Sequence, residues 1–296
     1  RIHRRRSRPD VATPPRSIDT EWFRQSLVND HLAPLLAAAP TPSGGLNAKF
    51  TRAWEPYPKQ RYGPTMQGRV LYGLALGYEL TSQSAYLTEV KRGADFILEH
   101  MIDREYGGVF QSVDANGKVV ASYKRLYGQA FAIFGLAHAY RVSRDERYLE
   151  AAVSIWERVR VQMRDESGGF FPESNRSFAK PSTTRNQNPI MHLFEALLAL
   201  HDATADRAWI DHSREIAEFV RTRLVQKSVG GRHGIPEYYD MGWRPLPPTS
   251  GGYIDLGHQV EWAWLFSAGV ERGLPESYVE PGARLLDFAI ANGYDR

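Results

Sequence analysis

Arg69, Tyr127, His192 and His258 are polar residues set inside segments that are otherwise almost entirely apolar. They follow one another at intervals of roughly 60 residues. Side chains of these types can bind hydroxyl groups, stabilise a developing oxyanion and exchange a proton near neutral pH. If the four segments are parallel helices around one centre, these side chains lie near the positive ends of the helix dipoles. The pattern therefore predicts a polar cup for a hydroxyl-rich ligand.

His258 is the predicted general acid/base. It stands in residues 255–262, which read Asp-Leu-Gly-His-Gln-Val-Glu-Trp. Residues three apart lie on one helical face, so Glu261 can hydrogen-bond His258 or bind substrate beside it. An imidazole has an unperturbed pKa of about 6.5, and a neighbouring carboxylate raises that pKa. We therefore predict catalytic roles for His258 and Glu261.

Each of these residues also has an ordinary structural interpretation. Arg69 could pair with a structural carboxylate, Tyr127 could simply pack, and His192 could be a hydrogen-bonded core histidine. Their recurrence in four repeats favours the functional interpretation. A different chemistry stays open, because a helical glycosidase or lyase needs two carboxylates beside a sugar bond. The candidates for that chemistry are Glu195, Glu237, Asp255 and Glu261.

Motifs of several other enzyme classes are missing from the sequence. It contains no Gly-x-Gly-x-x-Gly, Walker loop, Gly-x-Ser-x-Gly elbow or His-Glu-x-x-His. The 9 histidines have no spacing typical of a metal site, and there is no cysteine to act as nucleophile or ligand. We therefore expect neither a metal nor a cofactor. A sugar-binding module without catalysis is the remaining alternative.

The elements that must position the cup repeat with the same period. Gly-Gly pairs mark turns at 107–108, 168–169 and 230–231. Amphipathic patterns, typical of outer helices, open at Tyr86, Tyr148, Trp209 and Tyr278. Segments that are apolar almost all round, typical of inner helices, occupy residues 67–78, 127–140, 189–200 and 257–270.

Each unit thus combines an inner helix, an outer helix and a Gly-Gly turn. The turn predicts a small hairpin such as 108–113 with 118–121. Four such units and an N-terminal helix over about 19–38 make nine helices. The pattern predicts an all-α protein, an (α/α)6 toroid with small β-hairpins in its loops. Because a closed toroid has twelve helices, we expect about three C-terminal helices to be absent.

Composition limits the remaining function classes. The net charge is only +3, and five arginines lie in the first eight residues, so the rest of the chain is net acidic. Residues 1–18 are interpreted as a basic, disordered arm and residues 19–296 as one truncated toroid domain. We expect no nucleic-acid partner and no membrane span. The lack of cysteine suits a cytoplasmic location, and uncovered end helices predict self-association into a homo-oligomer.

Three segments resemble signature sequences of the N-acylglucosamine 2-epimerase family, which includes mannose isomerases and cellobiose 2-epimerases. They are YGQAF at 127–131, NPIMHLFEA at 188–196 and GHQVEW at 257–262. The resemblance runs from about Trp22 to the end of the chain. It implies an (α/α)6 barrel that acts on the open-chain form of a monosaccharide or disaccharide. It also implies that two histidines exchange the proton on C2 through a cis-enediol(ate), without a cofactor.

The resemblance also implies roles for single residues. His258 resembles one of the two acid/base histidines, whereas the family's second histidine lies on a late helix, beyond Arg296. The chain as printed could therefore be inactive. Some isomerases carry an arginine upstream of this histidine where the chain has Pro248, which disfavours an anionic sugar. The residues that resemble substrate-holding ones are Arg69, Tyr127, Asn188, His192 and Glu261.

Overall fold

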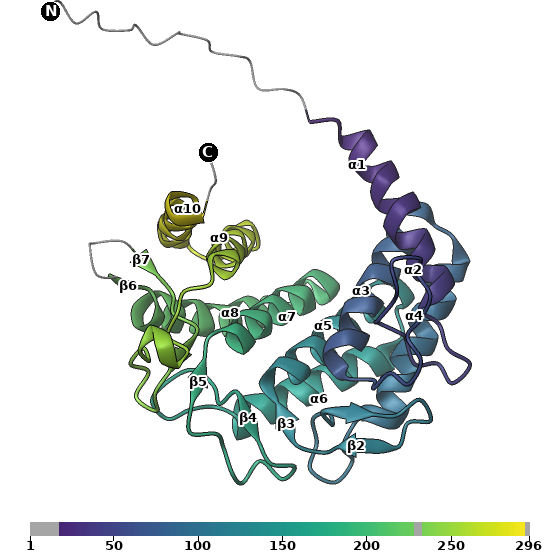
Figure 1. Cartoon of the computed structure of the whole chain (residues 1–296), viewed down its shortest axis with the longest axis horizontal. Helices are drawn as coiled ribbons and strands as arrows, with labels where there is room; N and C mark the ends of the chain where they lie inside the picture. Colours follow the sequence, from purple (N-terminus) through teal and green to yellow (C-terminus); the bar gives the residue numbers. More distant parts are fainter. Residues whose placement is uncertain (1–17, 228–232, 294–296) are drawn as a thin grey trace, which may run out of the picture.

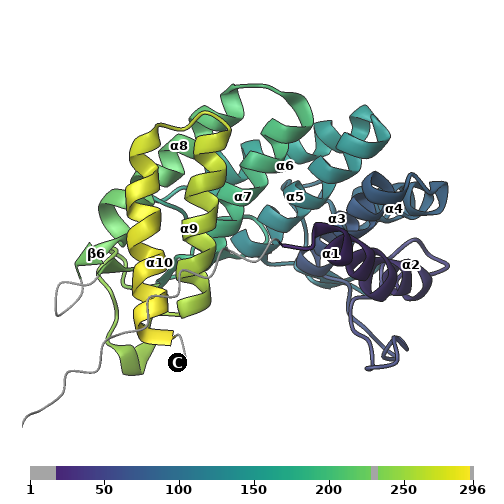
Figure 2. The same ribbon diagram turned by 90° about the horizontal axis from the view of Figure 1, so that it is seen from above.

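A computed structural model describes residues 18–227 and 233–293, and it is built mainly from paired helices (Figure 1). The inner helices are α3 (Pro64–Thr81), α5 (Leu126–Ser143), α7 (Asn188–Thr204) and α9 (Leu256–Glu271). The outer helices are α4 (Ser84–Phe96), α6 (Glu146–Gln162), α8 (Ala208–Phe219) and α10 (Val279–Gly293). Helices α1 (Thr20–Ser26) and α2 (Ala33–Ala38) precede them, joined by a π-helical segment, Leu27–Leu32. The described pairs follow an open arc, and α10 lies alongside α9 (Figure 2).

The predicted helical toroid is confirmed as a fold class, and all four expected inner helices are present. On α5 the buried residues extend around most of the helix, because neighbouring inner helices and an outer helix cover them. Helix α9 departs from the expected all-round burial, since Val260 and Trp264 are exposed. The outer helices bury one face only. None of the described helices is long and apolar enough to cross a membrane. The basic arm, residues 1–17, and the last Gly-Gly pair, 230–231, lie outside the described residues.

The described strands are short antiparallel pairs in the loops before the inner helices. They are β1 (Ser112–Val113) with β2 (Val119–Ala121), β3 (Lys124–Arg125) with β4 (Glu173–Ser174), β5 (Arg185–Asn186) with β8 (Tyr238–Tyr239), and β6 (Gln226–Lys227) with β7 (His233–Gly234). The hairpin predicted at 108–113 is shorter than expected, because only Ser112 and Val113 form its first strand. Strands β3 and β5 lead directly into α5 and α7, so their pairing positions the starts of two inner helices.

Glycine allows two inner helices to cross at close range. A Cβ on Gly68 would lie 2.0 Å from the carbonyl oxygen of Phe131, and one on Gly135 would lie 2.6 Å from the Cα of Gly68. Any larger residue would therefore push α3 and α5 apart. This approach brings Arg69, the residue after Gly68, over the ring of Phe131.

Three inner helices carry a buried glutamine that holds the loop in front of the helix. Gln67 bonds both the N–H and the carbonyl of Leu46, and Gln129 does the same for Val109. On α9, Gln259 brackets Ile235 in the same way. A buried backbone group without a partner costs free energy, so these amides satisfy loop groups that are removed from water. The loops that rim the cup are therefore tied to the inner helices.

Candidate active site

The N-terminal halves of the inner helices bring the predicted residues together. Arg69 donates a hydrogen bond to the hydroxyl of Tyr127 at 2.9 Å, and its guanidinium lies 4.5 Å from the centre of the Phe131 ring. The Tyr127 ring in turn meets the His192 ring edge to face, with 4.9 Å between centroids. Burial raises the pKa of Tyr127, so its hydroxyl is a neutral hydrogen-bonding group at pH 7. The set spans helices α3, α5 and α7.

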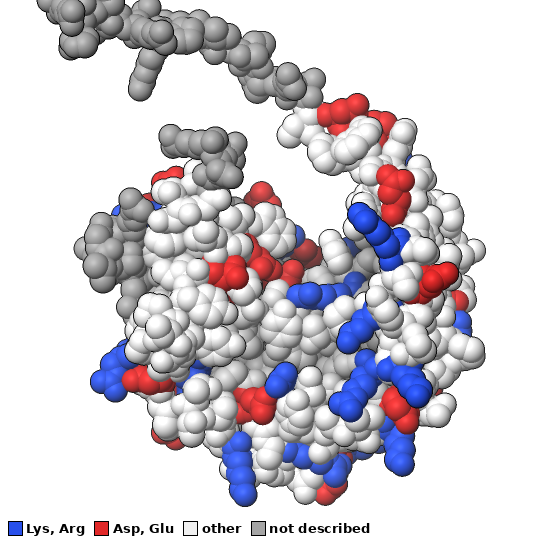
Figure 3. Space-filling model, in the orientation of Figure 1, with Lys and Arg blue, Asp and Glu red and all other residues white. Residues whose placement is uncertain are grey.

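A cavity of about 400 Å³ opens beside these residues. Tyr127 and Asn188 line it from the starts of α5 and α7, and Tyr238 lines it from β8. In the space-filling view, acidic and basic side chains face each other across the hollow of this face (Figure 3). Exposed polar groups of both charges around a cavity suit a ligand that both donates and accepts hydrogen bonds.

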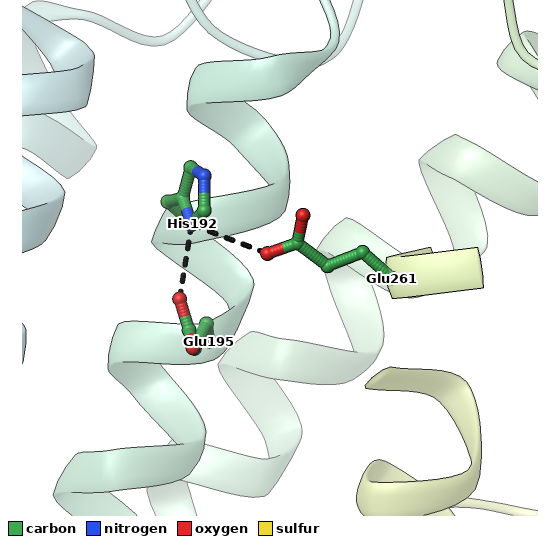
Figure 4. Close-up of side chains that lie close together, drawn as sticks. All are labelled: His192, Glu195 and Glu261. Atoms are coloured by element: carbon green, nitrogen blue, oxygen red, sulfur yellow. Dashed lines mark hydrogen bonds and ion pairs between the residues drawn. The ribbon is translucent and has the colours of Figure 1, made fainter. Parts of the chain in front are cut away.

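His192 forms a second cluster with two glutamates (Figure 4). Its Nδ1 lies 2.9 Å from Glu195 Oε2 on the same helix and 3.9 Å from Glu261 Oε1 on α9. His192 is 5% exposed, whereas the glutamates reach the surface of the cup with 21% and 36% of their side chains exposed. The cluster thus places fixed carboxylate oxygens where sugar hydroxyls could bind.

The same cluster is the set of described side chains that could hold a metal ion. One atom from each of His192, Glu195 and Glu261 lies within 4.8 Å of the others. Two carboxylates and one imidazole are a donor set that Zn²⁺ or Mn²⁺ can use. The hydrogen bond between His192 and Glu195 already satisfies the imidazole Nδ1 without an ion. The geometry therefore permits a cation but does not require one.

His258 lies apart from that cluster and has its own carboxylate. Its Nδ1 is 2.7 Å from Glu237 Oε1, and its Nε2 is 3.1 Å from the side-chain nitrogen of Asn188. The imidazole is 23% exposed and Glu237 only 3% exposed. Asp255 caps α9 by accepting a hydrogen bond from the backbone N–H of His258, which holds the histidine in the first turn. The result is a carboxylate–imidazole pair at the wall of the cup.

The pairing of Glu261 with His258, one of the two possibilities expected from their spacing, is wrong. The carboxylate bonded to His258 is that of Glu237, which lies on the loop before α9. The hydrogen bond that His258 donates to Glu237 raises the pKa of His258, partly opposed by burial, and the more distant charges of Asp255 and Glu261 add to the rise. Glu261 instead faces His192. The other expected role of Glu261, binding substrate, stays a prediction.

Two residues that lie beside His258 were not predicted from the sequence. Glu237 was considered only as a glycosidase carboxylate, and Gln187, which donates to Glu237 at 2.7 Å, was not considered at all. A signal existed for Gln187, since it is a polar residue directly before an inner helix. No sequence spacing links Glu237 to His258, because a loop brings them together. Asn188, which was predicted to hold the substrate, contacts His258 directly.

Comparisons with known proteins show which family the chain belongs to. The sequence profile of the N-acylglucosamine 2-epimerase family matches residues 44–296. A mannose-6-phosphate isomerase of Rhizobium meliloti (strain 1021) is 30% identical over 199 residues, which are 64% of this chain and 49% of that protein. A cellobiose 2-epimerase of Ruminococcus albus is 26% identical over 257 residues, 82% of this chain and 63% of that protein.

A solved structure supports the fold. The crystal structure of a D-mannose isomerase superposes with a TM-score of 0.86 at 20% identity, covering 94% of this chain and 73% of that one. The chain spans about half to two thirds of the length of the two curated relatives it matches above. The profile covers most of the chain, and the resemblance found in the three signature segments is thereby confirmed. The chain belongs to the N-acylglucosamine 2-epimerase family.

Proposed function

We propose that this protein interconverts an aldose with its 2-ketose or its C2 epimer, using His258 as the general acid/base. The observation that carries the proposal is the His258–Glu237 pair at the wall of a polar cup that also holds Arg69, Tyr127 and His192. The family membership supports it, since relatives carry the names of mannose isomerase and cellobiose 2-epimerase.

The chemistry starts from the open-chain aldose, in which the C1 carbonyl makes the C2 proton acidic. The neutral imidazole of His258 removes that proton, and the electron pair of the C–H bond moves into an enediolate spanning C1 and C2. Glu237 stabilises the imidazolium that forms, as the raised pKa of His258 indicates. No electrons leave the sugar, so the step needs no redox cofactor.

The fate of the proton decides the product. If the hydroxyl proton moves from O2 to O1 and His258 returns the carbon proton to C1 on the same face, the product is the ketose. If a group on the opposite face delivers a proton to C2, the product is the epimer. One base on one face therefore suffices for isomerisation, whereas epimerisation requires a second acid/base.

The other cup residues are proposed to hold the sugar. The Arg69 guanidinium and the Tyr127 hydroxyl form one hydrogen-bonded unit that can donate to the oxygen that becomes negative. The inner-helix dipoles point their positive ends to the same region. Glu261 and His192 offer groups for sugar hydroxyls from the facing helices, and Asn188 can act from beside His258.

A neutral sugar fits the proposed site better than an anionic one. Pro248 stands where some isomerases of the family carry an arginine. Arg125, which lines the cavity, is already paired with Glu173 at 2.8 Å. Mannose, an N-acylated hexose or a disaccharide such as cellobiose are therefore the proposed substrates.

The test follows protons in D2O by NMR with mannose, N-acetylmannosamine and cellobiose. The proposal expects loss of the C2 proton signal together with formation of ketose or epimer. New reducing ends released from a disaccharide would instead support a glycosidase that uses paired carboxylates. Sugar binding without any exchange would support a non-catalytic module.

A further inference from the structure

We infer that Trp262 and Gln187 are positioning residues that fix the tautomer of His258, so that its base nitrogen faces the cup. The inference rests on the proposed function for its catalytic consequence. The tautomer itself can be measured without substrate. Nothing in the sequence pattern assigns a role to either residue, and both are completely buried.

The indole of Trp262 determines how the Gln187 amide is oriented. Its Nε1 donates to Gln187 Oε1 at 2.6 Å. An indole N–H can only donate, so the amide atom that faces it must be the oxygen. The amide nitrogen of Gln187 therefore points the other way and donates to Glu237 Oε1 at 2.7 Å. Its longer separation from His258 Nδ1, 3.3 Å, is a contact between two donors if that nitrogen carries hydrogen, and the bond to Glu237 outweighs it.

This orientation in turn constrains the imidazole. Nδ1 of His258 lies 2.7 Å from Glu237 Oε1. An unprotonated Nδ1 at that distance would set its lone pair against a carboxylate oxygen, so Nδ1 carries the hydrogen. In the neutral ring the lone pair then belongs to Nε2, which receives a hydrogen bond from Asn188 at 3.1 Å. Asn188 also lines the cavity, so Nε2 is the ring nitrogen on that side, and a substrate would reach its lone pair by displacing the Asn188 amide.

One strand pair brings Gln187 and Glu237 together. Asn186 pairs with Tyr238 in β5–β8, and the next residue, Gln187, donates its backbone N–H to the carbonyl of Glu237 at 3.1 Å. The two side chains that meet at His258 are therefore held by the same short ladder. Their remaining freedom is the orientation of the Gln187 amide, which the indole N–H of Trp262 and the carboxylate of Glu237 fix from opposite ends.

Without the indole N–H, Gln187 Oε1 is a buried acceptor without its partner, so the amide is held only by Glu237 and the free-energy cost of turning it over falls. A flipped Gln187 would present its oxygen to Glu237 Oε1, and two acceptors at hydrogen-bond distance repel each other. Glu237 would then shift away from Nδ1, and neutral His258 would populate the form protonated on Nε2. In that form no base faces the substrate.

The decisive variant is Trp262→Phe, which keeps an aromatic ring and removes the N–H. Trp156→Phe is the matched control, because Trp156 is also buried and its Nε1 has no hydrogen-bond partner among the described residues. Long-range ¹⁵N–¹H NMR of histidine-labelled protein reports which ring nitrogen carries hydrogen. The His258 signals are identified by their loss in His258→Asn.

We expect wild type and Trp156→Phe to show neutral His258 protonated on Nδ1 alone, and Trp262→Phe to show a mixture of tautomers. Turnover of Trp262→Phe should fall about 10- to 100-fold, the loss typical when a group that orients an imidazole is removed. Its KM should stay within about twofold, because no sugar contact is lost. Gln187→Met should repeat both effects if Trp262→Phe does not fold.

A Trp262→Phe or Gln187→Met variant that keeps a single Nδ1–H tautomer would overturn the inference. So would wild-type His258 protonated on Nε2. If wild type shows the expected tautomer but catalyses no C2 exchange, the proposed function fails, whereas the role of Trp262 and Gln187 in fixing the tautomer is still supported. The two failures are thus distinguishable.

Discussion

Nδ1 of His258 lies 2.7 Å from an oxygen of Glu237, a carboxylate that is only 3% exposed. The pair joins the first turn of α9 to the loop before it, and the imidazole, which Asn188 contacts at Nε2, is 23% exposed. A carboxylate so placed stabilises the charged ring and holds its orientation. The predictions about pH and turnover follow from this relationship.

Glu237→Gln should move the acid limb of kcat/KM to lower pH. The raised pKa of His258 comes first from its hydrogen bond to Glu237, so removing the carboxylate charge lowers that pKa. Turnover at optimal pH should fall, because the imidazolium loses its partner. Glu261→Gln should shift the limb less, since Glu261 acts on His258 only from a distance. Equal shifts in pH–rate profiles of both variants would contradict this assignment.

The same pair should make stability depend on pH. Because the folded-state pKa of His258 is raised, its contribution to folding is fully present below the unfolded pKa of about 6.5. It is lost as pH rises through the higher folded-state pKa. Chemical unfolding of wild type and Glu237→Gln should therefore differ more at pH 5.5 than at pH 9. A difference that grows toward high pH would be inconsistent with a raised pKa.

His192→Ala should raise KM more than it lowers kcat. Its ring contacts Tyr127, bonds Glu195 and lies 3.9 Å from Glu261, whereas the carboxylate bonded to His258 is that of Glu237. Loss of binding common to ground and transition state appears in KM. Steady-state kinetics with mannose tests this, with His201→Ala, whose half-buried ring bonds a backbone carbonyl, as control. A kcat loss as large as that of His258→Ala would make His192 an acid/base instead.

The loop anchors should matter for stability without taking part in chemistry. Gln129→Ala leaves the buried N–H and carbonyl of Val109 unpaired, which should cost about 2 kcal/mol or more of unfolding free energy. Gln25→Ala, on the exposed face of α1, should change it by less than about 0.5 kcal/mol. Urea denaturation measures both, and similar losses would remove the anchoring role.

The fold was largely predictable from the sequence because the repeat is long and regular. The inner helix at α5 has its ends within three residues of the predicted segment, since an all-round apolar run leaves few alternatives. The turns at Gly107–Gly108 and Gly168–Gly169 have positive φ, which explains why glycine recurs there. Paired strands of two or three residues have no periodicity to detect, so small hairpins were predicted in the loops but residues were assigned to only one of them.

The site was predictable only as far as helices alone define it. Arg69, Tyr127 and His192 occupy related places on neighbouring inner helices, so a repeat argument brought them together correctly. The partner of His258 comes from a loop whose position depends on the β5–β8 register. Helical spacing suggested Glu261 instead, but side chains one turn apart can also face different neighbours.

Chelation tests whether the His192–Glu195–Glu261 cluster needs a cation. The proposed proton transfer requires none, so dialysis against EDTA should leave turnover within about twofold of the untreated protein. Metal analysis before and after dialysis is the control. A different result would assign the cluster as a metal centre: EDTA removes the activity, Zn²⁺ or Mn²⁺ restores it in wild type, and neither ion restores it in Glu195→Gln.

The most direct measurement of the central claim is exchange of the C2 proton of mannose in D2O, in wild type and His258→Ala. Exchange needs only one base on one face, so it tests His258 independently of which product forms. Wild type should exchange the C2 proton, and His258→Ala should reduce the rate about 10²- to 10⁴-fold, the usual contribution of a general base. Exchange at nearly the wild-type rate in His258→Ala would contradict the assignment and direct attention to the carboxylates of the cup.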